Sequence, residues 1–152
     1  MEANNANKDA VQKLREATGA GVMECHRALK DAGGDFAKAA ALIGEQGLSK
    51  VEKRAGRETS AGLVHAYVHG ERIGVLLHVS AETDFVVRSE PFKALAHELA
   101  MHIAAAAPKD IAELLGQPYI RDEKKTVNDL IGEVIAKVGE NIQVKEFYRI
   151  EL

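Results

Sequence analysis

Cysteine, tryptophan, proline and long apolar runs are scarce in this sequence of 152 residues. It has one cysteine, Cys25, so neither an internal disulfide nor a zinc site built from several cysteines can form. It has no tryptophan, and its three tyrosines and four phenylalanines are too few for an aromatic platform that stacks sugars or bases. Apolar runs such as 103–107 are five residues long, whereas a membrane helix needs about 20. These absences exclude disulfide scaffolds, zinc fingers and membrane-spanning proteins.

Charge is nearly balanced along the chain, with 20 basic and 23 acidic residues and a net charge of −3. Up to Ala61 there are ten basic and nine acidic residues, and beyond it ten and fourteen. Neither part has the dense positive charge that neutralises nucleic-acid phosphates, so we expect no direct nucleic-acid partner. The first nine residues are polar and contain no apolar core of a secretory signal. We therefore expect a cytoplasmic globular protein without a membrane partner.

Helical periodicity dominates the first 48 residues. Apolar positions recur at helical spacing over 8–17, from Val22 to Ala32, and from residue 36 to Gly47. Asp35 is the expected N-cap of the third helix. This pattern predicts a three-helix module over 1–48 that grips a partner, with a disordered N-terminal tail and with Phe36 as the large side chain of its core.

The pattern changes after a charged segment, 49–61, which we interpret as a linker. Alternating apolar residues over 63–69 and 72–81 predict two strands, and Gly70-Glu71 between them predicts a hairpin turn. A helix is expected over 90–107 and another from Thr126, with Asp129 completing a capping box. A last strand is expected over 142–152. The class is therefore α+β, and 62–152 is predicted to form a core with a three-stranded sheet and helices on one face.

No arrangement typical of catalysis survives inspection. His97 and His102 are five residues apart, which places them about 140° from each other around a helix, whereas a helical zinc pair needs a spacing of four. The segment 19–21 (GAG) lacks the third glycine of a dinucleotide fingerprint. Cys25 lies on the apolar side of its helix, which favours packing over reactivity. We therefore expect no enzymatic activity, no cofactor and no metal.

Two apolar side chains stand out because of their surroundings. Met23 lies 100° from Val22 around the helix, so its thioether either faces outward as an adaptable contact or folds back onto the connecting segment. Phe85 follows three polar residues in a segment between a strand and a helix. Its ring either packs into the core or is presented to another protein as an aromatic anchor.

Two segments carry a family resemblance. Residues 14–23 (LREATGAGVM) with Cys25, followed by Thr83-Asp84-Phe85-Val86, resemble bacterial elongation factor Ts in its short form with a single core module. The likeness extends over 92–104 and 138–142. The resemblance implies a helical module of the ubiquitin-associated type, a linker, and a core built on a three-stranded antiparallel sheet. It also implies a guanine-nucleotide exchange factor for elongation factor Tu, acting in translation elongation without bond chemistry of its own.

The resemblance also implies partner-binding residues. One group would touch the G domain of elongation factor Tu, in its GDP-bound and nucleotide-free forms: Arg15, Val22 and Met23. The other would enter between two helices of that partner near its magnesium site and promote GDP release: Thr83, Asp84, Phe85 and Val86. Short relatives act as homodimers, and we expect one here because a single small core offers little contact area. The segment between Pro108 and Thr126 is shorter than in those relatives.

Two other hypotheses make different predictions. In a plain binding module, 1–48 would recruit a peptide or helix and the core would only oligomerise, so that Met23 would matter and Phe85 would not. In a small metal-dependent enzyme, His97 and His102 would act together, and a chelator would abolish activity.

Overall fold

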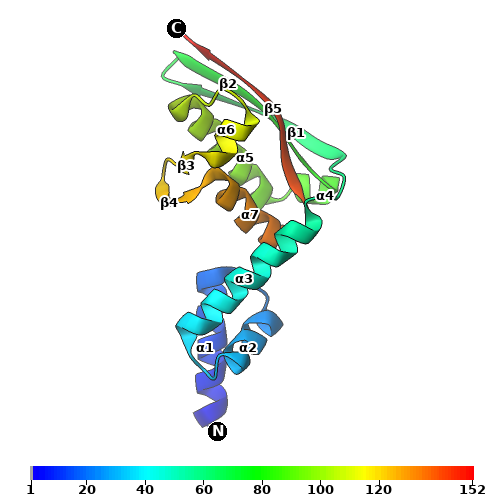
Figure 1. Cartoon of the computed structure of the whole chain (residues 1–152). Helices are drawn as coiled ribbons and strands as arrows, with labels where there is room; N and C mark the ends of the chain where they lie inside the picture. The colour runs from blue at the N-terminus through cyan, green and yellow to red at the C-terminus, as the bar shows by residue number, and fades with distance from the viewer. Residues whose placement is uncertain (1) are drawn as a thin grey trace. The chain divides into compact units, whose positions relative to one another are not determined.

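The computed structural model describes the backbone of residues 2–152 and the side chains from residue 7 onward. The chain divides into two compact units, Met1–Lys53 and Arg54–Leu152. Figure 1 shows helices alone in the first unit and a sheet with helices in the second. Among the described residues, no helix combines the length and the apolar composition that crossing a membrane requires.

The first unit contains α1 (Glu2–Thr18), α2 (Val22–Asp31) and α3 (Phe36–Arg54). Asp35 caps α3, since its Oδ1 accepts a hydrogen bond of 3.0 Å from the backbone N of Lys38, as predicted. Small and medium-sized side chains fill the core: Val11, Leu14, Cys25, Ala28, Leu29, Ala39 and Ile43. α1 begins at Glu2 and not near Lys8, so the described backbone of the predicted disordered tail is helical from Glu2 onward, while Met1 lies outside the described residues.

Two details of this unit differ from the prediction. Phe36 is 43% exposed and does not fill the core, because side chains tilt toward the N-terminus of a helix and Phe36 occupies the first turn of α3. α3 also continues past Gly47 to Arg54. A glycine inside a helix costs about 1 kcal/mol without ending it, and 48–54 contains no proline. The first half of the predicted linker is therefore helical.

The second unit is built on a three-stranded antiparallel sheet in the order β1-β2-β5, with β1 (Ala61–His69), β2 (Ile73–Ala81) and β5 (Ile142–Glu151). This confirms the α+β class and the predicted strands. The predicted hairpin turn is present, although three residues, 70–72, separate the paired His69 and Ile73. Gly70 and Glu71 have left-handed φ of 55° and 59°, and the backbone N of Arg72 donates to the carbonyl oxygen of His69 at 3.1 Å.

Helices cover one face of this sheet (Figure 1): α4 (Asp84–Val87), α5 (Glu90–Ala106), α6 (Ile111–Gly116) and α7 (Val127–Val138). Val75, Leu77 and Val79 of β2 are buried and point toward this helical layer, where Phe92 and Leu99 of α5 are fully buried. The alternation on β2 therefore predicted the core face correctly.

The segment between α5 and α7 contains elements that the sequence analysis did not predict. α6 is followed by a small hairpin of β3 (Pro118–Tyr119) and β4 (Asp122–Thr126). Gln117 Oε1 and the backbone N of Ile120 bond to the ring of His102 at 2.8 and 3.4 Å. The hydroxyl of Tyr119 bonds to Glu98, and burial together with this bond raises the pKa of Tyr119 to about 12. These contacts hold the segment on α5.

α7 begins and ends as its sequence predicts. Thr126 and Asp129 form the capping box, with bonds of 3.1 Å to the backbone N of Asp129 and 2.8 Å to that of Thr126. Gly139 ends the helix with φ of 79°, in the left-handed region that favours glycine. The chain then turns at once into β5.

Candidate partner-binding surfaces

The segment Thr83-Asp84-Phe85-Val86 follows β2 and contains the first three residues of the one-turn helix α4. The hydroxyl of Thr83 caps this helix by accepting a hydrogen bond of 3.4 Å from the backbone N of Val86. Val86 and Val87 are buried and anchor the turn. Successive side chains of a helix point about 100° apart, so the residue before these two faces away from the core. Phe85 is accordingly 86% exposed.

The structure therefore decides between the two interpretations of Phe85, because the ring is presented to solvent. Thr83 and Asp84 are exposed beside it. A large aromatic ring in water on an anchored turn is unusual, since such a side chain gains about 1.5–3 kcal/mol when it is buried. An exposed aromatic ring on an anchored turn can serve as an anchor in a pocket of another molecule.

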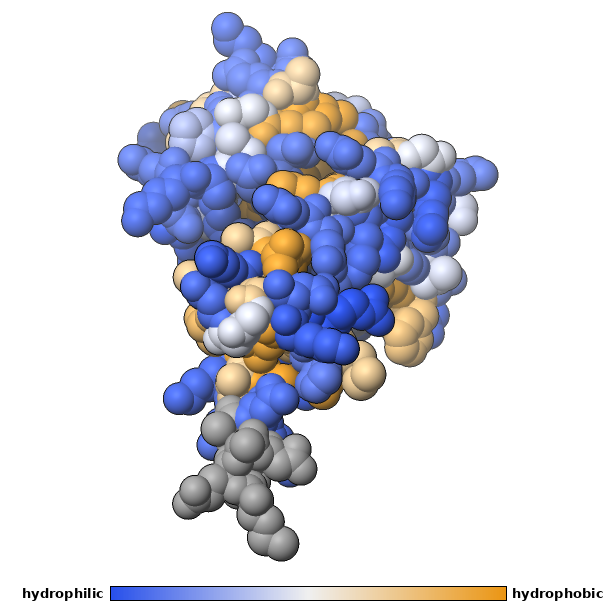
Figure 2. Space-filling model, turned by 60° about the horizontal axis from the view of Figure 1, so that its bottom comes forward, coloured by the Kyte–Doolittle hydropathy of each residue, from blue (hydrophilic) through white to orange (hydrophobic). Residues whose placement is uncertain are grey.

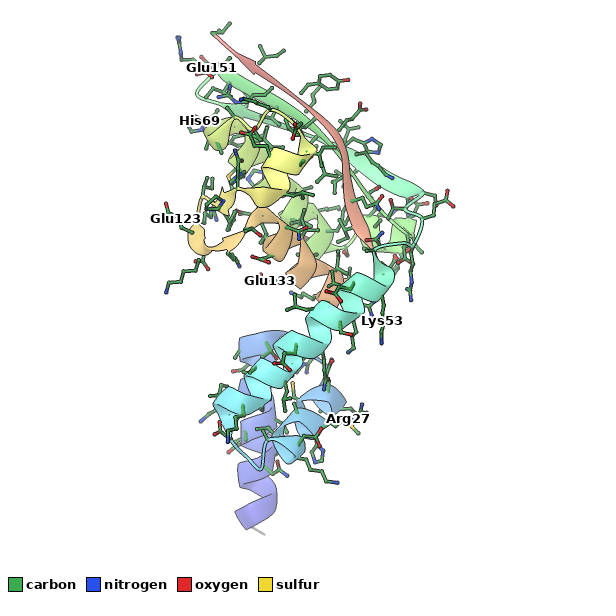
Figure 3. All side chains as sticks on the ribbon, viewed as in Figure 1. Arg27, Lys53, His69, Glu123, Glu133 and Glu151 are labelled. Carbon is green, nitrogen blue, oxygen red and sulfur yellow. The ribbon has the colours of Figure 1, made fainter. Side chains whose placement is uncertain are left out.

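The start of α2 forms a second surface, in the first unit. Val22 and Met23 are 51% and 72% exposed, so the thioether of Met23 faces outward. Both line a groove of about 520 Å³ together with residues of α2 and α3: Gly21, Glu24, Arg27, Gln46 and Lys50. Lys50 and Glu24 form an ion pair at its edge. Figure 3 shows Arg27 extending from α2.

Arg15 reaches the same part of this unit from α1. It lines a groove of about 510 Å³ with Val22. Val22 therefore lies between two grooves, one shared with Arg15 and the other with Met23. The two groups of candidate residues lie in different units of the chain, one in each.

A third candidate surface is the outer face of the sheet, whose residues the sequence analysis did not name. On the sheet face opposite the helices, Ala66 pairs with Leu76 and Leu76 with Tyr148, while Val68 pairs with Gly74 and Gly74 with Ile150. The large side chains of this outer sheet face are exposed by 51 to 71%: Val64, Val68, Leu76, Tyr148 and Ile150. Figure 2, in another view, shows apolar areas at the surface among hydrophilic ones. This face could have been predicted from the sequence, because β1 has apolar residues at even as well as odd positions, so that both of its faces are partly apolar.

The histidines do not form a joint site. His102 is fully buried and both of its ring nitrogens are bonded within the segment after α5, while His97 is exposed and contacts His65. In the part of the chain that the structure describes, no three His, Cys, Asp or Glu side chains are grouped to hold a metal ion. Cys25 is fully buried, as its position on the apolar side of α2 predicted.

Comparison with known proteins identifies the family. The family model described as elongation factor TS matches residues 82–152, which include the segment 83–86. Elongation factor Ts of Coprothermobacter proteolyticus is 42% identical over 91% of this chain and 94% of its own length. Elongation factor Ts of Moorella thermoacetica is 40% identical over 93% of each chain. That of Thermotoga petrophila is 40% identical over 95% of this chain and 94% of its own.

The alignments with these relatives span 185 to 188 positions, whereas this chain has 152 residues. The relatives therefore contain residues that have no counterpart here. Nearly the full length of each relative is nevertheless matched, and the identities lie at or above 40% in all three. The chain thus belongs to the elongation factor Ts family of translation elongation factors.

Proposed function

We propose that this protein is the guanine-nucleotide exchange factor for elongation factor Tu, and that it acts in the cytoplasm without bond chemistry of its own. The observation that carries this proposal is the exposure of Phe85, 86%, on a turn anchored by buried valines. The turn lies within the residues that match the family model. An exchange factor needs such a rigid protrusion, because it acts by deforming its partner.

The segment 83–86, which we call the exchange loop, would enter between two helices of elongation factor Tu near the magnesium site. A factor accelerates nucleotide release only if it binds the nucleotide-free or distorted partner more tightly than the loaded one. The coupling is reciprocal, so the nucleotide weakens binding of the factor by the same ratio. Displacing those helices would loosen the magnesium contacts, expose phosphate charge and release GDP. Binding of GTP would then expel the factor.

The first unit would hold the G domain of the partner. Val22 and Met23 offer an exposed apolar contact, and Arg15 adds a positive charge beside them. A methionine side chain adapts to an irregular apolar surface at little cost. In this proposal 1–48 is the gripping module, 49–61 the linker, and 62–152 the core that carries out exchange and dimerisation.

The core would form a homodimer through the outer sheet face. This face carries a continuous row of apolar side chains across all three strands. Monomeric proteins rarely expose large contiguous apolar patches, and a second copy offers the same flat apolar surface in return. A two-fold arrangement satisfies both faces at once.

The experiment follows the release of a fluorescent GDP from elongation factor Tu with wild type and with Phe85→Ala. Strong acceleration by wild type and at least tenfold less by the variant, about 1.4 kcal/mol, is the expected result. Acceleration by both would retain the function and assign it to Arg15, Met23 and the core. Acceleration by neither would refute the proposal and favour a plain binding module, in which Met23 matters and Phe85 does not.

A further inference from the structure

We propose that Glu140 is a positioning residue for the exchange loop, and that it acts through Thr83. The inference rests on the proposed function. Glu140 lies at the turn between α7 and β5, 57 positions from Thr83 in sequence. It has no role in the sequence analysis beyond its place in a family-like segment.

The carboxylate of Glu140 binds Thr83 at two groups. Its Oε1 accepts from the backbone N of Thr83 at 3.1 Å and from the hydroxyl at 2.6 Å, and its Oε2 lies 3.0 Å from the same hydroxyl. A hydroxyl has one hydrogen to donate, and the Thr83 hydroxyl donates it to the carboxylate of Glu140. The lone pairs of Thr83 are thereby left to accept from the backbone N of Val86, which is the bond that caps α4.

A second carboxylate, that of Glu82 beside Thr83, binds the backbone beside Glu140 in the same way. Glu82 Oε1 accepts a hydrogen bond of 2.7 Å from the backbone N of Asn141. The last ladder pair between β2 and β5 is Ala81 with Ile142. The two carboxylates therefore continue the contact between these chain segments beyond the end of the sheet. Glu140 binds the backbone that follows β2, and Glu82 binds the backbone that precedes β5.

The turn that carries Glu140 is itself fixed. Asn141 is 3% exposed, and its side-chain N donates to the carbonyl oxygens of Arg57 at 2.8 Å and Ala55 at 3.4 Å. Gly139 sets the chain direction with a positive φ of 79°. Glu140 thus projects from a rigid support, as a positioning residue must.

The consequence for exchange follows from the cost of ordering a loop. Phe85 lies two residues beyond Thr83, so the orientation of its ring depends on the start of α4. A loop held in its binding conformation before the encounter does not lose that entropy on binding. Bonds to a carboxylate are also stronger than neutral ones. Without Glu140 we expect Thr83 to sample other rotamers and Phe85 to be misdirected for part of the time.

The test compares Glu140→Ala with Glu140→Gln in the complete protein. An alanine removes every acceptor, while a glutamine oxygen can still accept from both groups of Thr83. For Glu140→Ala we expect the concentration of factor that gives half-maximal GDP release to rise about tenfold, with a maximal rate within about twofold of wild type. Glu140→Gln should recover most of the loss, which a role in stability alone would not predict.

Controls separate the inference from its rivals. Glu133→Ala removes an exposed carboxylate of α7, labelled in Figure 3, that pairs with Lys125, and it should behave like wild type. Thr83→Val combined with Glu140→Ala should be no worse than the more impaired single variant. Amide hydrogen exchange in α4 should be faster in Glu140→Ala at an unchanged midpoint of thermal unfolding.

Three outcomes would overturn the positioning role. The first is a Glu140→Ala protein with wild-type concentration dependence and wild-type amide protection in α4. The second is equal impairment of the alanine and glutamine variants together with a lowered unfolding midpoint. The third is additive loss in the double variant. If wild type itself fails to release GDP, the proposed function fails, and the amide exchange still reports whether Glu140 orders the loop.

Discussion

The Nε2 atom of His65 on β1 lies 3.2 Å from the Nδ1 atom of His97 on α5. The ring of Tyr67 meets the His97 ring edge-on, with centroids 5.6 Å apart. A hydrogen bond between two imidazoles needs one hydrogen between the facing nitrogens. Protonation of both rings would place two positive charges in contact. Burial, and secondly the neighbouring His97, lower the pKa of His65 below its ordinary value of 6.5.

The pair predicts that acid weakens the core. Because the pKa of His65 is lower in the folded state, the unfolded chain binds more protons between the two pKa values, and stability rises with pH there. The contribution of neutral His65 to stability is complete above about pH 6.5 and is lost as the pH falls through the folded-state pKa. Thermal unfolding of wild type and His65→Asn at pH 7.5 and 5.5 should show the smaller acid-induced decrease in the variant. Equal decreases in the unfolding midpoint would show that protonation of His65 does not cause the loss of stability in acid.

Alanine substitutions of Phe85 and Phe92 should differ strongly in their effect on the free energy of unfolding. Phe92 is fully buried and Phe85 is 86% exposed, although both lie near the start of a helix. Phe92→Ala should lower the free energy of unfolding by about 3–5 kcal/mol, while Phe85→Ala should change it by less than about 0.5 kcal/mol. Urea titrations measure both. A large loss in Phe85→Ala would mean that its ring packs on the core and is not free for a partner.

Met23 should contribute to partner binding without contributing to folding. Its side chain is 72% exposed, and we expect its truncation to cost about 1.4 kcal/mol, or tenfold in affinity, as for one of the minority of interface residues that carry most of the binding energy. Titration of Met23→Ala with nucleotide-free elongation factor Tu measures this loss. Leu48, 60% exposed on α3, provides the matched control, since Leu48→Ala should bind like wild type. Equal affinities of all three proteins would remove Met23 from the interface.

The outer sheet face should control the oligomeric state. Ile150 is 71% exposed and pairs with Gly74 toward one end of the face, so Ile150→Lys would place a charge in the proposed dimer contact. Burying an unpaired charge is costly, and we expect sedimentation to show a dimer for wild type and a monomer for the variant. Ile120→Lys, at a residue 42% exposed in another region of the core unit, should remain dimeric. A wild-type monomer that still releases GDP would exclude the dimer.

Local sequence signals predicted the regular elements well where an element supplies its own stabilising pattern. The alternation on β2 and the Thr126–Asp129 capping box are of this kind, and both are confirmed. Prediction failed where length or packing depends on neighbours. α3 continues through Gly47 because nothing in the following turn ends it. The hairpin after α6 is too short to be stable alone and exists because His102 binds it.

The α+β class, the strands and long helices of the core and the family could all be predicted from the chain alone, because these depend on periodicity and on motifs read along it. The exposure of Phe85 and the burial of Val86 and Val87 became clear only from the folded structure. The same holds for the separate partners of His97 and His102 and for the binding of Thr83 by Glu140. The physical reason is the same in each case. The environment of a side chain is set by elements that are distant in sequence, and local patterns carry no record of which elements will pack together.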